Sequence, residues 1–194
     1  MRDRLAVFTT AAAVAVLTSA CGTVPTTGTP EPSAGPSSPA PTLPPRPRQI
    51  DLTGVDTCTL LTPEQQRRLG TDHAPVASME TDRYGNTYCD YGKNQSSPRF
   101  GYSVKVVTQE DATVYLTRER DAVARVVSAA GFPAVEARPP GDERGCFVFV
   151  STTGGQYLSV QYSESTGSDD TTEVACEKAR VAAELAMQTL LTQR

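Results

Sequence analysis

Four cysteines in the C-terminal three quarters of the chain constrain its folding more than any other feature. They are Cys58, Cys89, Cys146 and Cys176. An even number of cysteines in an exported domain indicates two disulfide bonds, because such domains fold in an oxidising compartment. Four cysteines allow three pairings, and the sequence alone does not choose among them. We favour Cys58–Cys89 with Cys146–Cys176, each closing a loop of about 30 residues and contributing roughly 3–4 kcal/mol in the chain-entropy model.

A zinc site or reactive thiols are the alternatives for these cysteines. The chain has no Cys-x-x-Cys pair, and its single histidine, His73, is far from every cysteine in the sequence. Structural zinc sites typically take two ligands from such closely spaced pairs. We therefore expect no metal and no cofactor.

The N-terminal residues have the pattern of a bacterial lipoprotein signal peptide. A basic start is followed by an uncharged, mostly apolar run from Leu5 to Ala20, which ends in small residues before Cys21. Thr18 stands where leucine is usual in this pattern. We expect residues 1–20 to be removed and Cys21 to carry the lipid, on the extracytoplasmic face of the cell membrane. An uncleaved anchor is the alternative, although the run is shorter than the roughly 20 residues that a membrane-spanning helix needs.

The segment after Cys21 has the composition of a disordered tether. Residues 22–49 number 28, of which nine are proline, and most of the others are threonine, serine, glycine or alanine. Such a segment has too little apolar surface to offset the entropy of ordering. We therefore predict that residues 21–49 hold a folded domain away from the membrane surface.

Residues 50–194 have the size of a single globular domain. Removal of residues 1–20 takes away two arginines and one aspartate, which leaves 16 basic and 21 acidic residues and a net charge of −5. The basic residues are scattered, whereas binding to a nucleic-acid backbone requires a concentrated basic patch. The sequence thus argues against nucleic acid as a partner.

A short helix is expected at the start of this domain. Thr62 can cap it, Pro63 suits its first turn and Gln65 can complete a capping box. Gly70 has the usual role of the residue that ends a helix.

Two further helices are expected, over residues 110–121 and from a cap within residues 170–173 to about Leu191. In the last helix Val174, Val181 and Leu185 form the predicted apolar stripe. Beside this stripe lie Ala183, Met187 and Leu190.

Alternating and β-branched residues predict the strands of the domain. We expect strands at residues 86–91, 102–107, 123–128 and 133–135, and a hairpin formed by 146–150 and 156–162; the alternative for 123–128 is a continuation of the preceding helix. Phe147 and Phe149 share one face of the first hairpin strand, and Val148 and Val150 share the other, which indicates a covered, central strand. A polar loop is expected over residues 163–170. The fold class is therefore α+β: a mainly antiparallel sheet with packed helices and two disulfides.

The cysteine motifs resemble those of a known family. Residues 58–65 read Cys-Thr-Leu-Leu-Thr-Pro-Glu-Gln, residues 88–91 read Tyr-Cys-Asp-Tyr, and residues 131–135 read Gly-Phe-Pro-Ala-Val. With the lipoprotein signal, the Pro-rich tether and Cys176 in a C-terminal helix, this order resembles an actinobacterial lipoprotein family whose domain has no assigned function. The resemblance implies a lipid anchor and two disulfides within the domain. Tyr91 departs from the tryptophan that is common in relatives.

No catalytic motif is recognisable, and we do not expect an enzyme. The domain has no Gly-x-Ser-x-Gly or Ser-x-x-Lys motif, and a nucleophile that works through histidine would have to use His73. Acidic residues at 164, 169, 170 and 173 could hold calcium, but they lack the spacing of a calcium loop, and a solvated loop with a helix cap is favoured. Candidates for an aromatic binding platform are Tyr84, Tyr88, Tyr91 and Tyr102; we favour two in the core and two on the surface.

Three functions remain open. The favoured one is a non-enzymatic accessory domain that binds an envelope protein, and it predicts an exposed apolar patch. The second is a carrier or sensor of a small ligand, which predicts an enclosed apolar pocket. The third is a hydrolase of wall polymers, which predicts a cleft with two carboxylates.

Overall fold

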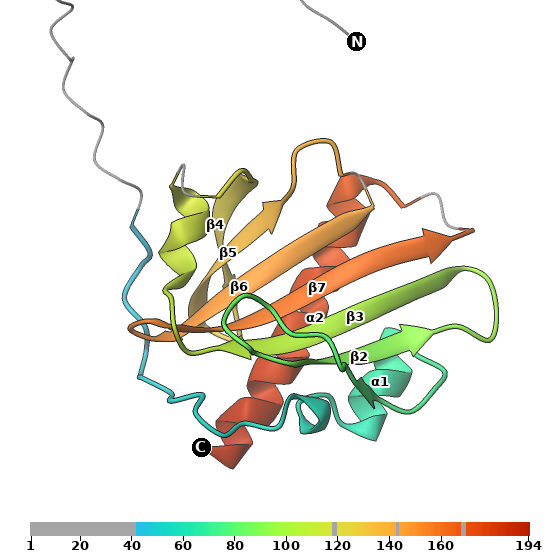
Figure 1. The fold of residues 1–194 in the computed structure, drawn as a ribbon, viewed down its shortest axis with the longest axis horizontal. Helices are drawn as coiled ribbons and strands as arrows, with labels where there is room; N and C mark the ends of the chain where they lie inside the picture. Colours follow the sequence, from blue (N-terminus) through green and yellow to red (C-terminus); the bar gives the residue numbers. More distant parts are fainter. Residues whose placement is uncertain (1–41, 118–119, 143, 168–169) are drawn as a thin grey trace, which may run out of the picture. The chain divides into compact units, whose positions relative to one another are not determined.

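The computed structural model describes residues 42–117, 120–142, 144–167 and 170–194, and its centre is a seven-stranded antiparallel sheet (Figure 1). The strand order is β1-β2-β3-β7-β6-β5-β4. The strands are β1 (Val76–Ala77), β2 (Tyr88–Lys93), β3 (Arg99–Val107), β4 (Val123–Ala129), β5 (Phe132–Arg138), β6 (Gly145–Thr153) and β7 (Gln156–Thr166). The helices are α1 (Pro63–Leu69) and α2 (Thr172–Gln193), with 3-10 turns η1 (Thr57–Thr59) and η2 (Ala112–Leu116). The expected antiparallel sheet is thus confirmed, including a strand rather than a helix at β4.

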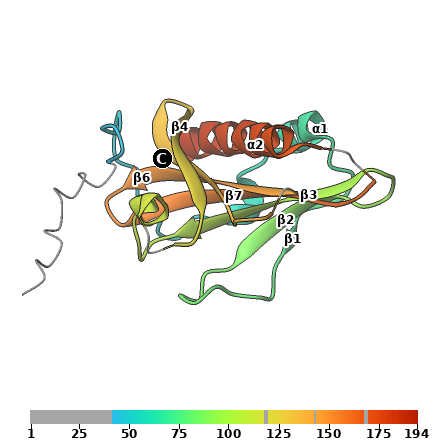
Figure 2. The same cartoon turned by 90° about the horizontal axis from the view of Figure 1, so that it is seen from above.

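One helix, α2, lies along one face of the sheet (Figures 1 and 2). Its buried side chains are mostly small: Ala175, Ala179, Ala182, Ala183 and Ala186, with Leu185, Met187 and Leu190 toward its end. The expected stripe is wrong at its start, because Val174 is 41% exposed. Small side chains let the helix backbone lie close to the strands, so burial follows the alanines rather than the larger valines.

The two disulfides have the pairing that we favoured. Cys58–Cys89 joins η1 to β2, with Cα atoms 5.1 Å apart, and Cys146–Cys176 joins β6 to the start of α2, with Cα atoms 4.9 Å apart. Each bridge connects the sheet to an element that packs on it. The disulfides therefore fix the same face of the sheet at two places.

Helix α1 begins and ends at the residues that the sequence indicates. The Thr62 hydroxyl accepts a hydrogen bond from the Gln65 backbone, the Gln65 side chain accepts one from the Thr62 backbone, and Gly70 adopts a left-handed conformation. The helix also reaches α2, because the Gln65 amide donates to the Leu185 carbonyl oxygen over 2.9 Å.

Two expected element boundaries are wrong. Among the described residues, the helix expected over residues 110–121 is only the 3-10 turn η2, in which Tyr115 stacks on Phe149 of the sheet. The loop expected from residue 163 begins later, because β7 continues to Thr166 and pairs there with Arg99 of β3. In both cases a contact with a distant strand decides the local structure.

Residues 42–49, from the predicted tether, contact the domain. The Arg46 guanidinium donates to Ser151 Oγ over 2.6 Å and pairs with Asp111 at 3.2 Å. The predicted leader, the predicted lipidation site Cys21 and the tether up to residue 41 lie outside the described residues. Within the described residues, no helix is both long and apolar enough to cross a membrane.

Candidate functional site

The sheet face opposite α2, here called the open face, carries two rows of side chains that cross the strands. Strand register places one row in the order Asp90, Ser103, Gln161, Phe147 and Ala137. The neighbouring row runs Tyr88, Lys105, Ser159, Phe149 and Val135. Side chains paired in this way lie on the same face and touch across strands. Both rows change from polar on β2, β3 and β7 to apolar on β6 and β5.

The polar half of the open face is hollowed. The short side chains Ser103 and Ser159 lie beside the longer Lys105, Gln161 and Tyr88, and the hollow between them has a volume of about 200 Å³. Ser103 donates a hydrogen bond to Asp90, and Lys105 pairs with Asp82 at 3.0 Å. The hollow therefore offers hydroxyl, amide and ammonium groups to a bound molecule.

The apolar half of the open face is an aromatic stack that η2 partly covers. Val135, Ala137 and Phe149 are buried, whereas Phe147 and Tyr115 are partly exposed. The rings of Phe147 and Phe149 are stacked with centroids 5.7 Å apart, and Tyr115 from η2 stacks on Phe149 at 3.6 Å. A second hollow of about 220 Å³ lies against these rings, lined also by Ala122 and Ala137. Aromatic faces beside polar groups are typical of surfaces that bind sugars, peptides or protein side chains.

Glu110 is the centre of a cluster of hydrogen-bonded polar side chains at one end of the open face. Its carboxylate accepts hydrogen bonds from Arg83 (2.6 Å), Arg120, Tyr84 (3.0 Å) and Tyr157 (2.7 Å). Burial, with hydrogen bonds to Tyr115 and Glu110, raises the pKa of Tyr157 well above its usual range. Tyr157 is thus a fixed hydrogen-bond donor. The carboxylate joins the loop before β2 to the segment around η2, and its oxygens are occupied by these partners.

The four tyrosines expected to form a platform are divided between the two faces. Tyr91 and Tyr102 are paired across β2 and β3 on the α2 side, and both are buried. Tyr88 is on the open face, and Tyr84 is 40% exposed and bound to Glu110. Only Tyr88 therefore lines the polar hollow, and no single platform of four rings exists.

Most residues of the open face were not singled out from the sequence. Alternation in β6 did place Phe147 and Phe149 on a common face. It could not show that Ser103, Lys105, Ser159 and Gln161 complete this surface, because that depends on the register of β3, β7 and β6.

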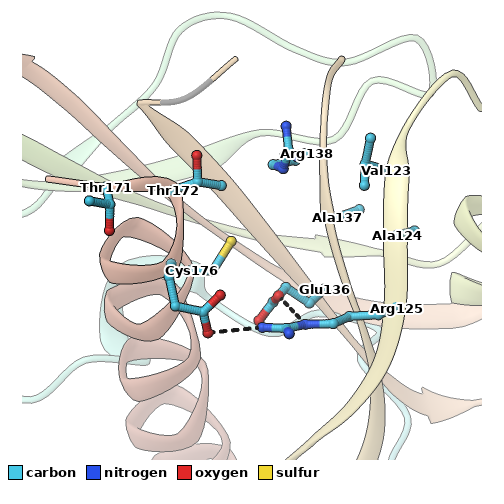
Figure 3. A pocket seen from close by; sticks show the side chains of 10 residues that line it. Val123, Ala124, Arg125, Glu136, Ala137, Arg138, Thr171, Thr172 and Cys176 are labelled. Carbon is cyan, nitrogen blue, oxygen red and sulfur yellow. Dashed lines mark hydrogen bonds and ion pairs between the residues drawn. The ribbon is translucent and has the colours of Figure 1, made fainter. Parts of the chain in front are cut away.

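A separate cleft of about 460 Å³ lies between strands β4 and β5 and the start of α2 (Figure 3). Here Glu136 is 5% exposed and pairs with Arg125 at 2.6 Å and Arg180 at 3.3 Å. Glu173 pairs with the same two arginines, at 3.2 and 3.5 Å. Hydrogen bonds to Glu136 and Glu173 raise the pKa of Arg125. Each buried charge in this network thus has an opposite charge beside it.

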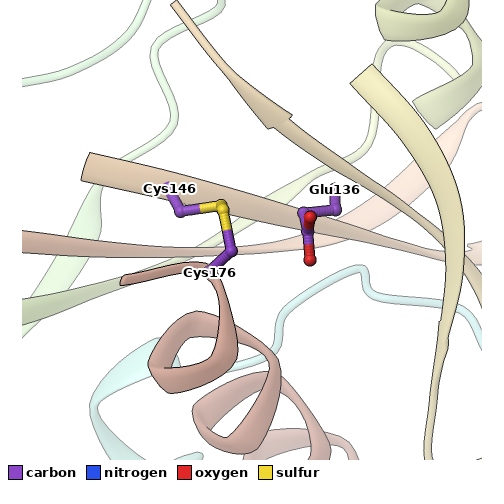
Figure 4. Close-up of side chains that lie close together, drawn as sticks. All are labelled: Glu136, Cys146 and Cys176. Carbon is purple, nitrogen blue, oxygen red and sulfur yellow. A yellow bond between two sulfur atoms is a disulfide. The ribbon is translucent and has the colours of Figure 1, made fainter. Parts of the chain in front are cut away.

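One group of possible metal ligands adjoins this cleft (Figure 4). A Glu136 oxygen and the sulfur atoms of Cys146 and Cys176 lie within 4.8 Å of one another. The two sulfur atoms are bonded to each other as a disulfide, whereas metal binding requires thiolates. In this oxidised state the group offers a metal ion a single carboxylate.

The remaining candidate groups have structural contacts. His73 is half-buried, and its ring nitrogens lie 2.7 Å from the Ala74 carbonyl oxygen and 3.0 Å from the Asn94 amide. Asp170 accepts a hydrogen bond from Tyr162 (2.7 Å) and pairs with Lys178. Of the other acidic residues considered for calcium, Asp169 lies outside the described residues.

A comparison with known families gives one match. Residues 16–189 match the model of a family described as a protein of unknown function, DUF3558. No curated protein and no solved structure shows detectable similarity to the chain.

Proposed function

The chain belongs to the DUF3558 family of proteins of unknown function, and we propose that it is a non-enzymatic accessory domain that binds an envelope protein through its open face. In this proposal a lipid on Cys21 holds the domain outside the membrane, and residues 22–41 give it reach. The signal-like N-terminus and the Pro-rich composition support this placement.

The observation that carries the proposal is the composition of the open face. The partly exposed rings of Phe147 and Tyr115, which stack on the buried Phe149, adjoin a row of serine, glutamine and lysine side chains. Protein interfaces combine apolar anchors with surrounding hydrogen-bonding groups in this manner. Both disulfides and α2 are on the other face, so they do not cover Phe147 or the polar hollow.

A carrier or sensor of a small ligand is the second candidate. The hollow beside Phe147 and Phe149 supports it, because an aromatic wall next to Lys105 and Ser159 could hold a flat, partly polar molecule. The hollows on the open face are shallow depressions of about 200 to 280 Å³ that open to solvent. Ligand carriers usually enclose most of the ligand surface, and this geometry therefore favours a macromolecular partner.

The experiment is a comparison of two charge substitutions in the full, membrane-anchored chain. Phe147→Asp places a carboxylate in the centre of the open face, and Val76→Asp places one at an exposed position on β1 as the matched control. Proteins that co-purify from crosslinked membranes are quantified by mass spectrometry. We expect a near-stoichiometric partner to fall by about tenfold or more with Phe147→Asp alone, since a buried unpaired charge at an interface costs several kcal/mol.

Two outcomes would contradict the proposal. If the same amount of partner co-purified with both variants, the open face would not be part of the interface. A retained small molecule with no protein partner, lost in Phe147→Asp, would favour the carrier instead.

A further inference from the structure

Strand β4 is an edge of the sheet whose outer side has no strand beside it in the described part of the chain. It forms a hairpin with β5 through a two-residue turn, in which Ala130 and Gly131 have φ values of 48° and 81°. Such turns are closed by a hydrogen-bonded pair, here Ala129 and Phe132, and hydrogen-bonded pairs then alternate along the strands. The backbone N–H and C=O groups of Ala124, Val126 and Ser128 therefore point outward, away from β5.

Apart from one charged residue, Arg125, this edge lacks the devices that usually prevent strand addition. Over its seven residues β4 contains no proline, and its pairing with β5 has no register shift. Val123 and Val126 are 52% and 41% exposed. Its one charged residue, Arg125, is held on the α2 side by Glu136 and Glu173. By contrast, the opposite edge strand, β1, has only two residues.

The cleft between β4, β5 and α2 lies directly beside this edge (Figure 3). A strand added to β4 would direct alternate side chains to the face that contains this cleft. Most charges there are balanced within the Arg125, Glu136, Glu173 and Arg180 network. Arg138 is paired with Val123 in register and lines the cleft, and its side chain has no ion pair or hydrogen bond with any described residue. Arg180 also pairs with Glu177, so Arg138 is the arginine at the cleft that has no carboxylate partner among the described residues.

We infer that β4 accepts an extended segment of a protein partner as an additional antiparallel or parallel strand, with an acidic side chain directed into the cleft toward Arg138. The outward backbone groups supply the main-chain hydrogen bonds, Val123 and Val126 supply apolar contact, and Arg138 selects for the acidic side chain. This division of roles is the usual one in strand addition, where the main chain gives affinity and alternate side chains give specificity.

A second copy of this chain fits the edge less well. Two β4 strands paired about Val126 would place Arg125 diagonal to its own image on the same face. The pairing would bring a further cation toward the cleft, and neither Arg138 would gain a carboxylate. Charge complementarity thus favours an acidic partner segment. The inference concerns a surface other than the open face, and it does not rest on the proposed function.

The test uses synthetic peptides of about nine residues, a usual strand length, as probes for the full chain. The peptides alternate threonine and valine around a central glutamate, glutamine or lysine, and binding is measured by fluorescence anisotropy. We expect the glutamate peptide to bind about tenfold or more tightly than the lysine peptide, because like charges in an interface are strongly unfavourable. Hydrogen exchange should slow at Ala124, Val126 and Ser128.

Two changes in the protein separate the backbone from the charge contribution. Val126→Pro removes one outward N–H, which an edge strand tolerates, and should abolish binding of every peptide. Arg138→Gln should abolish the preference for glutamate over lysine, whereas Arg68→Gln on α1, an exposed control, should leave it unchanged. A glutamate peptide N-methylated on the alternate amides that face β4 should not bind to the unaltered chain, which tests the backbone contribution without any risk to folding.

Several results would overturn the inference. These are no binding by any peptide at millimolar concentration, binding that survives both Val126→Pro and N-methylation, and equal binding of the glutamate and lysine peptides. Self-association of the chain that Val126→Pro abolishes would assign the edge to a second copy. None of these results would alter the effect expected of Phe147→Asp, so the two proposals fail separately.

Discussion

The Tyr91 hydroxyl connects the first disulfide-linked segment to the sheet. It donates a hydrogen bond to the Thr57 carbonyl oxygen over 2.7 Å and accepts one from the Leu61 backbone N–H over 3.4 Å. The ring is fully buried in the core. A tryptophan at this position, as the family resemblance leads one to expect, would fill space without the same two hydrogen bonds. The tyrosine thus combines packing with the satisfaction of buried backbone groups.

Replacement of Tyr91 by phenylalanine should lower the free energy of unfolding by about 1–3 kcal/mol at pH 8, because two buried backbone groups lose their partner. Burial raises the pKa of Tyr91 to about 12 from a usual value of 10.0. The neutral phenol is therefore favoured in the folded state, and its contribution is complete below pH 10 and is lost as the pH rises toward 12. At pH 11 this loss amounts to about 1.4 kcal/mol.

Urea unfolding of the wild type and Tyr91→Phe at pH 8 and pH 11 measures this effect. The stability of the variant should fall by about 1.4 kcal/mol less than that of the wild type between the two pH values. An identical fall in both proteins would show that burial does not raise the pKa of Tyr91.

The tyrosines also show how much of a residue's position can be predicted from the sequence. Alternation within β2 and β3 gives the relative faces of neighbouring residues, such as Tyr88 and Tyr91. It does not reveal which face α2 covers, because the small alanines that determine this carry little hydrophobic signal. The division into two core and two surface tyrosines was expected, whereas the identity of each pair required the packed structure.

At the scale of elements, the Cys146–Cys176 bridge joins the centre of the sheet to α2. Removal of both cysteines as Cys146→Ala with Cys176→Ala should lower the free energy of unfolding by roughly 3–4 kcal/mol, the loop-entropy value for about 30 residues. Removal of Cys58 and Cys89 in the same way is the matched comparison, since its loop has nearly the same length. Thermal unfolding monitored by circular dichroism measures both, and unchanged melting temperatures would contradict a stabilising role.

Elements with a strong local signal could be predicted, and those set by distant contacts could not. The capping box of α1 and the glycine turn between β6 and β7 are encoded in consecutive residues. The 3-10 turn η2 depends instead on Phe149, and the extension of β7 to Thr166 depends on Arg99. Strand register also depends on contacts between distant segments. The two rows of the open face form only when five strands are aligned with one another.

For the molecule as a whole, the structure supplies a sheet with α2 on one face. On the other face η2 covers part of β5 and β6, and a polar hollow lies over β2, β3 and β7. The leader pattern, the tether composition and the net charge of −5 for the chain without its leader are properties of the sequence alone. They predict where the domain is held and argue against a nucleic-acid partner, but they do not locate a binding surface. That surface emerges from strand register and from the position of α2.

The central claim is that a lipid-anchored domain meets an envelope protein through its open face, and site-specific photo-crosslinking in cells tests it most directly. A photoreactive residue replaces Gln161 on the open face or, as a control, the exposed Glu184 on α2, and each is also combined with Cys21→Ser. We expect one envelope protein to crosslink from position 161 only, and only while Cys21 is present. Equal crosslinking from position 184, or crosslinking at 161 that persists without Cys21, would contradict the account.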